Sequence, residues 1–257
     1  MQGAIAGDVI GSVHEWTRTK TKDFPLFVRH STFTDDSVLT VAVADWILSG
    51  GDLIDMFHDY VRDYPGRGYG TMFGDWAGTR SREPYNSYGN GAAMRVSPVG
   101  FAFDTIEDVL TYSARSAAVT HDHEEGIRGA QATAAAVFHA RKYHDKDKLR
   151  DYVTTQFGYN LSRRLDEIRP GYTFNETCNG TVPQALISFL ESAGYEDAIR
   201  NAISLGGDAD TLACITGGVA EAYYGGVPQE IADRVTALLD DKMIAVLKRF
   251  RNRFHLP

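Results

Sequence analysis

The chain has 257 residues, of which 43% are hydrophobic and 23% charged, a composition typical of soluble globular proteins. Its 34 acidic and 26 basic residues give a net charge of −8, and the basic residues form no stripe, so nucleic acid binding is disfavoured. The two cysteines have no CxxC or Cys/His spacing, which argues against a disulfide scaffold and against structural zinc.

Neither the first residues nor any apolar run predicts export or membrane insertion. The N-terminus MQGAIAGDVIG lacks a basic region and carries Asp8 within its apolar stretch, so we do not expect a signal peptide. No uncharged apolar run approaches the ~20 residues that a membrane span needs. We therefore expect a cytoplasmic protein, and we expect a monomer.

Apolar residues at spacings of three and four predict helices through most of the chain. In chain order these cover residues 3–16, 35–49, 52–63, 105–118, 124–143, 147–157, 181–192, 195–204, 210–224 and 228–250. The alternation typical of strands is nearly absent, and repeated strand and helix units are missing. The sequence therefore predicts an all-α fold. With no internal repeat, low-complexity segment or linker, it predicts one domain over residues 1–257.

Two of the predicted helices, 3–16 and 210–224, are rich in glycine and alanine. Small residues allow neighbouring backbones to approach closely, so we expect both helices at the centre of the fold. Irregular stretches lie at 17–33, 64–101 and 158–180. The middle one is too long for a simple connection, and long ordered loops usually carry function.

Acidic residues open the predicted helix in STFTDDSVLTVAVADWIL. Thr34 is a suitable N-cap, and Asp35 and Asp36 in the first turn would interact well with the helix dipole. Capping alone usually explains such a site. This helix is apolar almost all round, however, so its acidic start is expected to be buried.

The stretch GGDADT repeats this pattern at the start of another apolar helix. Asp208 and Asp210 are two residues apart, so they do not share a helix face, and we expect them to flank the turn that begins the helix. In GDVIGSVHEW, Asp8, Ser12 and Glu15 fall on one face of the predicted helix 3–16. Capping explains each motif separately but explains the three together poorly.

Carboxylates that share a buried space raise the cost of one another's ionisation, so they either stay protonated or are neutralised by cations. Carboxylate and hydroxyl oxygens without histidine or thiolate select hard ions such as Mg²⁺, Mn²⁺ or Ca²⁺. Two divalent ions would suit this number of acids. GGDADT would then supply part of a metal site, with its glycines permitting the turn.

The loop motifs allow two interpretations. The glycines of 68–70 and 89–91 are typical of simple turns, but glycine-rich backbone can also cradle phosphate. Three tyrosines could pack at a rim or form a platform for a base: Tyr69, Tyr85 and Tyr88. His121 and His123 could bind metal, although such a pair near a helix start more often caps it. Arg95 could pair with a structural acid and stays unassigned.

The segments GAIAGDVIGSVHEW, FTDDSVLT and SLGGDADTLACITGGVAEAYYG resemble the three signature segments of the ADP-ribosylglycohydrolases. The likeness extends in the same order through RGYG, NSYGNGAAMRVSPVG, VTHDHEEG and TVPQALISFLES, and so covers nearly the whole chain. The resemblance implies an all-α, compact orthogonal helical bundle with two Mg²⁺ or Mn²⁺ ions at its centre.

The resemblance also implies roles for individual residues. It implies a set of metal ligands: Thr34, Asp35, Asp36, Asp208, Asp210 and Thr211. Glu15 matches a glutamate near the scissile bond, and Glu15, Asp36 and Asp208 are the candidate catalytic residues. The expected substrate-binding residues are Gly68, Tyr69, Gly70, Tyr85, Ser87, Tyr88, Gly89, Asn90, Gly91 and His121.

The expected function is that of a magnesium-dependent hydrolase. It would cleave the glycosidic bond between ADP-ribose and an acceptor, with arginine-linked ADP-ribose favoured, and release free ADP-ribose. The expected partner is ADP-ribose or an ADP-ribosylated protein or small molecule. The alternatives are another ADP-ribose linkage or small ADP-ribosyl compound, a non-catalytic metal-dependent ADP-ribose binder, and a two-metal phosphohydrolase.

Overall fold

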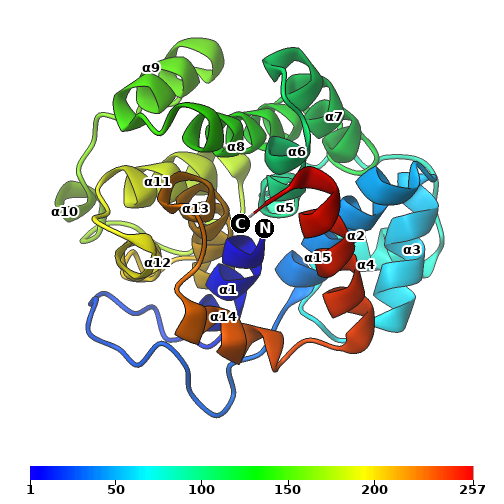
Figure 1. Ribbon diagram of the computed structural model, residues 1–257, viewed down its shortest axis with the longest axis horizontal. Helices are drawn as coiled ribbons and strands as arrows, with labels where there is room; N and C mark the ends of the chain where they lie inside the picture. The colour runs from blue at the N-terminus through cyan, green and yellow to red at the C-terminus, as the bar shows by residue number, and fades with distance from the viewer. Residues whose placement is uncertain (257) are drawn as a thin grey trace.

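The computed structural model describes residues 1–256, and its regular structure is helical (Figure 1). The first helices are Gln2–Gly11 (α1), Asp35–Ser49 (α2), Leu53–Asp63 (α3), Thr71–Gly78 (α4), Gly91–Met94 (α5), Ser97–Ala102 (α6), Ile106–Ala118 (α7) and Glu124–Tyr143 (α8). The others are Lys146–Phe157 (α9), Leu165–Ile168 (α10), Cys178–Leu190 (α11), Tyr195–Ile203 (α12), Ala209–Tyr224 (α13), Gln229–Thr236 (α14) and Asp241–Phe254 (α15). Within residues 1–256, Gly89 and Thr177 form an isolated antiparallel β-bridge. The predicted all-α fold is confirmed.

The helices α1 and α13 lie side by side at the centre of the molecule, and their backbones touch (Figure 1). A Cβ atom added to Gly7 would lie 2.0 Å from the carbonyl oxygen of Ala213, and one added to Gly3 would lie 2.4 Å from that of Gly217. Side chains at these positions would force the helices apart. The small residues therefore place both helices in the core, as predicted, and the antiparallel register sets the end of α1 against the start of α13.

The other helices surround this central pair (Figure 1). The long helix α8 packs on α13 and also contacts α5, α6, α7, α9 and α11. On another side α2 packs against α3, α6 and α15, while α12 lies against α11 and α13. The starts of α2 and α13 are thereby held in the interior, with Asp36 and Asp210 both buried.

The structure corrects several predicted helix boundaries. The predicted helix 3–16 ends at Gly11, and residues 12–18 form turns in which the Ser12 hydroxyl donates to the carbonyl of Val9 and the Thr17 hydroxyl to that of His14. Local bonds of this kind compete with helix. Glu15 therefore does not share a face of α1 with Asp8, contrary to expectation.

Two further stretches also differ from the prediction. The predicted helix 228–250 is two helices, α14 and α15, because Asp240 caps a new helix by accepting a hydrogen bond from the backbone N–H of Met243. The stretch 64–101, expected to be irregular, contains α4, α5 and most of α6. These helices are short, so their periodicity is weak in the sequence.

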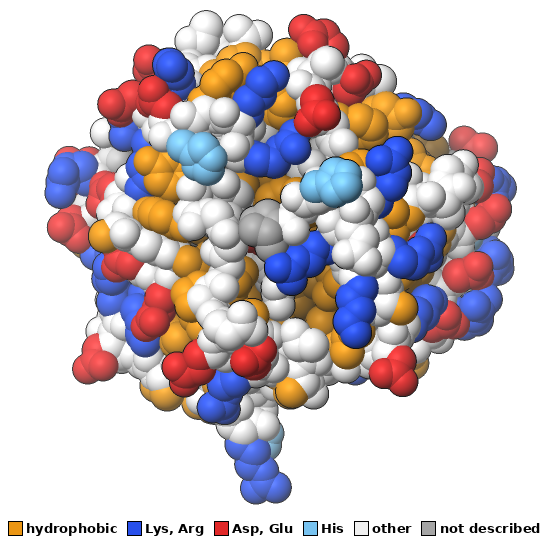
Figure 2. Space-filling view, in the orientation of Figure 1, with side chains coloured by type: hydrophobic (Ala, Val, Ile, Leu, Met, Phe, Trp, Pro, Cys, Tyr) orange, Lys and Arg blue, Asp and Glu red, His pale blue; other side chains and the backbone are white. Residues whose placement is uncertain are grey.

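Acidic and basic side chains are mixed over the face shown in Figure 2. None of the helices between residues 1 and 256 combines the length and the apolar character that a membrane crossing requires. The predicted domain of residues 1–257 includes Pro257, which lies outside the described residues.

Candidate active site

A cavity of about 710 Å³ opens where the starts of α2 and α13 meet the turn after α1 and four loops. These loops precede α4, α5, α8 and α11. Most of the predicted site residues line it: Glu15, Thr34, Asp35, Asp36, Gly68, Gly70, Tyr85, Ser87, Tyr88, Gly89, Asn90, Gly91, His121, Asp208, Asp210 and Thr211. The fold thus brings together residues that are almost 200 positions apart in the sequence.

Tyr69 is the predicted site residue that does not line this cavity. Its hydroxyl donates to the carbonyl oxygen of Tyr64 at 2.9 Å, and its ring stacks on Phe73 with 5.9 Å between the centroids. The Tyr69 side chain therefore fixes the loop before α4, while its neighbours Gly68 and Gly70 face the cavity.

Three aspartates cluster at the starts of α2 and α13, and we call this part of the cavity, which Asp36 and Asp210 line, the acidic end. Asp8, Asp36 and Asp210 each offer a carboxylate oxygen, and these three oxygens lie within 4.8 Å of one another. All three residues are buried. Asp8 comes from α1, Asp36 from the first turn of α2 and Asp210 from the first turn of α13. The contact between α1 and α13 thus positions two of them.

Asp8 differs from its neighbours because its oxygens are occupied. It accepts hydrogen bonds from the Thr34 N–H at 2.9 Å, the Thr34 hydroxyl at 2.7 Å and the Ser37 N–H at 3.1 Å, and from the Ser37 hydroxyl. Asp36, in contrast, has one buried oxygen, Oδ1, without a hydrogen-bond partner. Asp8 therefore anchors the start of α2, and Asp36 keeps one buried oxygen without a donor within residues 1–256.

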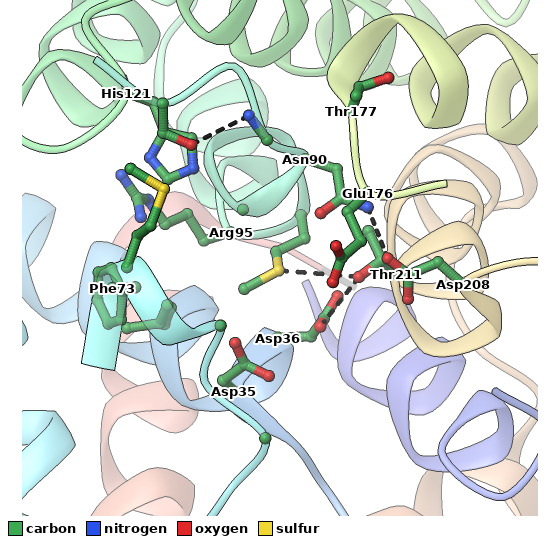
Figure 3. A pocket seen from close by; sticks show the side chains of 18 of the residues that line it. Asp35, Asp36, Phe73, Asn90, Arg95, His121, Glu176, Thr177, Asp208 and Thr211 are labelled. Atoms are coloured by element: carbon green, nitrogen blue, oxygen red, sulfur yellow. Dashed lines mark hydrogen bonds between the residues drawn. The ribbon is translucent and has the colours of Figure 1, made fainter. Parts of the chain in front are cut away.

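The turn GGDADT brings Asp208 to the same cavity. Gly206 has a φ of +67°, a value that favours glycine, and a Cβ at Gly207 would lie 2.3 Å from the ring of Tyr172. The turn conformation therefore requires Gly206, and the close packing against Tyr172 requires Gly207. Asp208 Oδ2 accepts a hydrogen bond from the Asn90 side chain at 2.7 Å, which joins this turn to the loop before α5 (Figure 3).

Burial and the charge of Asp210 raise the pKa values of four neighbouring aspartates. Burial, followed by the charge of Asp210, raises the pKa of Asp8 to about 7. The same two causes raise the pKa values of Asp35, Asp36 and Asp208 well above the usual range. Protons or bound cations would therefore stabilise this group of buried carboxylates.

The residues present fit a divalent metal. The free Oδ1 of Asp36 is a buried acceptor without a donor, and Thr34 and Thr211, which carry hydroxyl oxygens, line the same cavity as Asp36. Oxygen donors of this kind, without histidine or thiolate, suit hard cations. The buried aspartates could therefore hold a metal ion.

Glu15 lies in the turn after α1 and borders the acidic end. Its side chain is partly exposed, unlike that of Asp36. Burial, then the charges of Asp210 and Glu176, raises the pKa of Glu15 to about 7. A carboxyl with this pKa can hold or release a proton near neutral pH.

The opposite end of the cavity carries positive charge. In Figure 3, Arg95 and His121 lie across the cavity from Asp36, Asp208 and Thr211. Arg95 is fully buried and makes no ion pair within residues 1–256, and burial lowers its pKa to about 10, so it stays charged at neutral pH.

Backbone hydrogen bonds fix the loop of residues 85–91 at this end. The Asn90 N–H donates to the Glu176 carbonyl at 2.7 Å, and the Cys178 N–H donates to the Tyr88 carbonyl at 3.0 Å. Tyr88 is 54% exposed at the opening, while Tyr85 is partly buried with its ring centroid 5.9 Å from that of His121.

Sequence reasoning missed several lining residues. Arg95 was left unassigned, although an arginine within the apolar run GAAMRVSPVG is a signal of a buried charge. The segment before α11 was also missed: Phe174, Asn175, Glu176 and Thr177. It lies in an irregular stretch without a periodic or glycine-rich pattern, so nothing in the sequence indicated it.

The chain matches the family model described as ADP-ribosylglycohydrolase over residues 1–256, and it therefore belongs to the ADP-ribosylglycohydrolase family. It is similar to ADP-ribosylhydrolase ARH3 of Mus musculus, with 28% identity over 88% of this chain and 82% of the relative. It is also similar to ADP-ribosylarginine hydrolase Tri1 of Pseudomonas putida, with 25% identity over 91% of this chain and 72% of the relative.

A solved structure described as an ADP-ribosylglycohydrolase-related protein complex has the same fold. Its TM-score is 0.66 at 23% identity, and the match covers 98% of each chain. Family membership assigns the protein to the hydrolases that act on ADP-ribosyl groups.

Proposed function

We propose that this protein is a hydrolase, dependent on two Mg²⁺ or Mn²⁺ ions, that cleaves the glycosidic bond between ADP-ribose and an acceptor and releases free ADP-ribose. Arginine-linked ADP-ribose is the favoured substrate. The main support for the proposal is the separation of charge within one cavity, which has buried acids at one end and the buried cation Arg95 at the other.

This separation of charge supports one orientation of ADP-ribose in the cavity. The diphosphate is anionic, so it is placed at the end that holds Arg95 and the loop of residues 87–91, where Gly89 and Gly91 leave room beside His121. The adenine is placed near Tyr85 and Tyr88, which can stack on a base. The distal ribose then reaches the acidic end.

At the acidic end the proposed metal ligands are Thr34, Asp35, Asp36, Asp208, Asp210 and Thr211. Bound divalent ions would supply Lewis acidity and lower the pKa of a bound water. Asp8 supports the site through its hydrogen bonds to Thr34 and Ser37, which hold the start of α2 in place.

Glu15 is assigned the proton transfer, because its pKa of about 7 lets it accept a proton from water at neutral pH. Asp36 and Asp208 are the other candidates, and both are buried in the same end. Positive charge that develops on the ribose during bond cleavage would be stabilised by the surrounding carboxylates.

Two features support the arginine linkage. The relative from Pseudomonas putida is named for ADP-ribosylarginine hydrolysis. In this chain Glu15 and Glu176 both border the acidic end, and their charges interact. Two carboxylates at this place would attract a cationic guanidinium.

The proposal is tested by incubating the protein with arginine-linked, serine-linked and small-molecule ADP-ribose, with Mg²⁺, with Mn²⁺ and with EDTA. We expect free ADP-ribose from the arginine-linked substrate only when metal is present. Full activity in EDTA would refute the metal requirement, release of phosphate would indicate a phosphohydrolase, and binding without turnover would indicate an ADP-ribose binder. Cleavage of another linkage alone would reject the arginine preference.

A further inference from the structure

A chain of hydrogen bonds connects the buried Arg95 to His121 at the cavity. Arg95 Nη2 lies 2.8 Å from Thr120 Oγ1, and Thr120 Oγ1 lies 2.8 Å from His121 Nδ1. All three residues are buried. The other ring nitrogen, Nε2, faces the glycines of the loop, since a Cβ added to Gly91 would lie 3.1 Å from it.

The donors and acceptors in this chain can be assigned from their chemistry. A guanidinium only donates, so Thr120 Oγ1 must accept from Arg95. The hydroxyl has one hydrogen of its own, and two neighbours can accept it: His121 Nδ1, at 2.8 Å, and the phenol oxygen of Tyr85. Tyr85 can instead donate its own hydroxyl hydrogen to Thr120, which leaves the Thr120 hydrogen for His121 Nδ1, and Nδ1 then carries no proton.

The charge of Arg95 acts in the same direction. Burial, then the positive charge of Arg95, lowers the pKa of His121 well below its usual value, so the ring is neutral at physiological pH. A neutral ring whose Nδ1 accepts must carry its proton on Nε2. The hydrogen atom on Nε2 then faces the side of the cavity formed by Gly89 and Gly91.

We propose that Arg95 and Thr120 are positioning residues that hold His121 as the neutral Nε2–H tautomer, a fixed donor for an oxygen of the ligand's diphosphate or ribose. With the opposite tautomer, a nitrogen lone pair would face those oxygens and repel them. This role rests on the proposed binding of ADP-ribose in the cavity, whereas the tautomer is a property of the protein alone.

The tautomer is tested first, on the unliganded protein at pH 7, by a long-range ¹H–¹⁵N correlation spectrum of protein labelled at histidine. His121→Asn identifies the His121 signals by their loss. We expect one protonated nitrogen, Nε2, and one unprotonated nitrogen, Nδ1. A protonated Nδ1 or a charged ring would overturn the proposal, and the phenol oxygen of Tyr85 would then be the acceptor for Thr120.

The hydrogen bonds from Arg95 through Thr120 to His121 form a relay, and the effect of this relay is tested with three variants. Thr120→Val removes the hydroxyl, so His121 should populate both tautomers and ADP-ribose affinity should fall ~3- to 10-fold, the scale of one hydrogen bond. Thr120→Ser keeps the hydroxyl and should restore the single tautomer and the affinity. Ser116→Ala is the matched control, since it removes a buried hydroxyl without a hydrogen-bond partner and leaves the carbonyl that accepts from Arg95.

The two measurements separate failure of the relay from failure of the proposed function. If the native protein has the expected tautomer but does not bind ADP-ribose, the proposed function fails and the positioning role fails with it, while the tautomer assignment stands. If ADP-ribose binds and Thr120→Val changes neither tautomer nor affinity, the relay is refuted. If Thr120→Val does not fold, the native spectrum and Thr120→Ser still decide the assignment.

Discussion

At one end of the cavity the acidic side chains come from the starts of two core helices, α2 and α13, and the buried Asp8 of α1 joins their cluster. At the other end the lining comes from loops, which backbone hydrogen bonds join across long sequence separations, as between Asn90 and Glu176. The two ends also differ in charge, since the first gathers buried carboxylates and the second holds Arg95 without an acid partner within residues 1–256.

This difference shows how each end is held together. The carboxylates at the acidic end are held close because the helices that carry them are tightly packed, as the close approach of Gly7 to Ala213 shows. The loop end has no such repulsion and is fixed by hydrogen bonds such as that between the Cys178 N–H and the Tyr88 carbonyl. Substitutions at the acidic end should therefore change metal binding and chemistry, and those at the loop end should change ligand affinity.

The largest effect is expected at Asp210. Asp210→Asn should lose metal affinity and turnover, because the neutral amide cannot offset the charge of an ion held among buried acids. A metal ion contributes several kcal/mol, so turnover should fall by about 10³ or more. Calorimetric metal titration and release of ADP-ribose measure both losses. Asp151→Asn, on the exposed side of α9, is the control and should change neither. Native metal affinity in Asp210→Asn would show that Asp210 is not a ligand.

A smaller and more selective loss is expected at Glu15. Glu15→Gln should keep most metal and ADP-ribose affinity, since this residue lies in the turn after α1 and outside the cluster of Asp8, Asp36 and Asp210. The chemical step should slow by about 10² to 10⁴, the usual contribution of a positioned acid or base. Single-turnover kinetics beside metal titration provide the measurement. Metal loss equal to that of Asp210→Asn would make Glu15 a ligand, and full rate would make it structural.

The acidic end could largely be predicted from the sequence because its residues are local signals. Thr34, Asp35 and Asp36 stand at the start of an apolar helix, and burying acids there is costly enough to need a reason. The helix itself is long and periodic, which makes its start easy to place. The predicted helix starts and the shared cavity agree with the structure, whereas the role of each acid stays a prediction.

The loop end could not be predicted in the same detail because its contacts are made by backbone atoms and by residues far apart in sequence. Nothing in FNETC indicates that Glu176 lies beside Asn90. The position of Glu15 could not be predicted for a related reason. The helix α1 ends at Gly11, where the Ser12 hydroxyl donates to a backbone carbonyl, although the apolar spacing predicts a helix over 3–16. Tyr69 was predicted to bind substrate because it lies between two glycines, but its side chain packs on Phe73.

A third expectation concerns pH and the acidic end without metal. The raised pKa of Asp8, about 7, and the raised values of Asp35 and Asp36 mean that the folded state binds more protons than the unfolded state between about pH 4 and pH 7. In EDTA the free energy of unfolding should therefore be greatest below this window and fall as pH rises through it. The slope is about 1.4 kcal/mol per pH unit for each group that is protonated only when folded.

Thermal unfolding in EDTA from pH 5 to pH 8 measures this slope. Added Mg²⁺ or Mn²⁺ should raise the melting temperature most at the upper end, because metal binds the deprotonated carboxylates of the folded state. Asp36→Asn should flatten the slope in EDTA and weaken the response to metal. A melting temperature that rises with pH in EDTA, or the same metal response at pH 5 and pH 8, would contradict the prediction.

The smallest effect is expected at Tyr88, on the rim of the loop end. Its side chain is 54% exposed and its ring contacts His123 edge to face at 5.5 Å between centroids, so one face can take the adenine. Tyr88→Ala should weaken ADP-ribose binding by about 1 kcal/mol, the lower limit for a base stacked on an aromatic ring. Metal affinity should not change, because Tyr88 is outside the acidic cluster. Calorimetric titration with ADP-ribose measures this loss, and Tyr143→Ala, at another exposed tyrosine, is the control. If Tyr88→Ala binds ADP-ribose with unchanged affinity, Tyr88 only packs at the rim, and Tyr85 would be the residue that stacks on adenine.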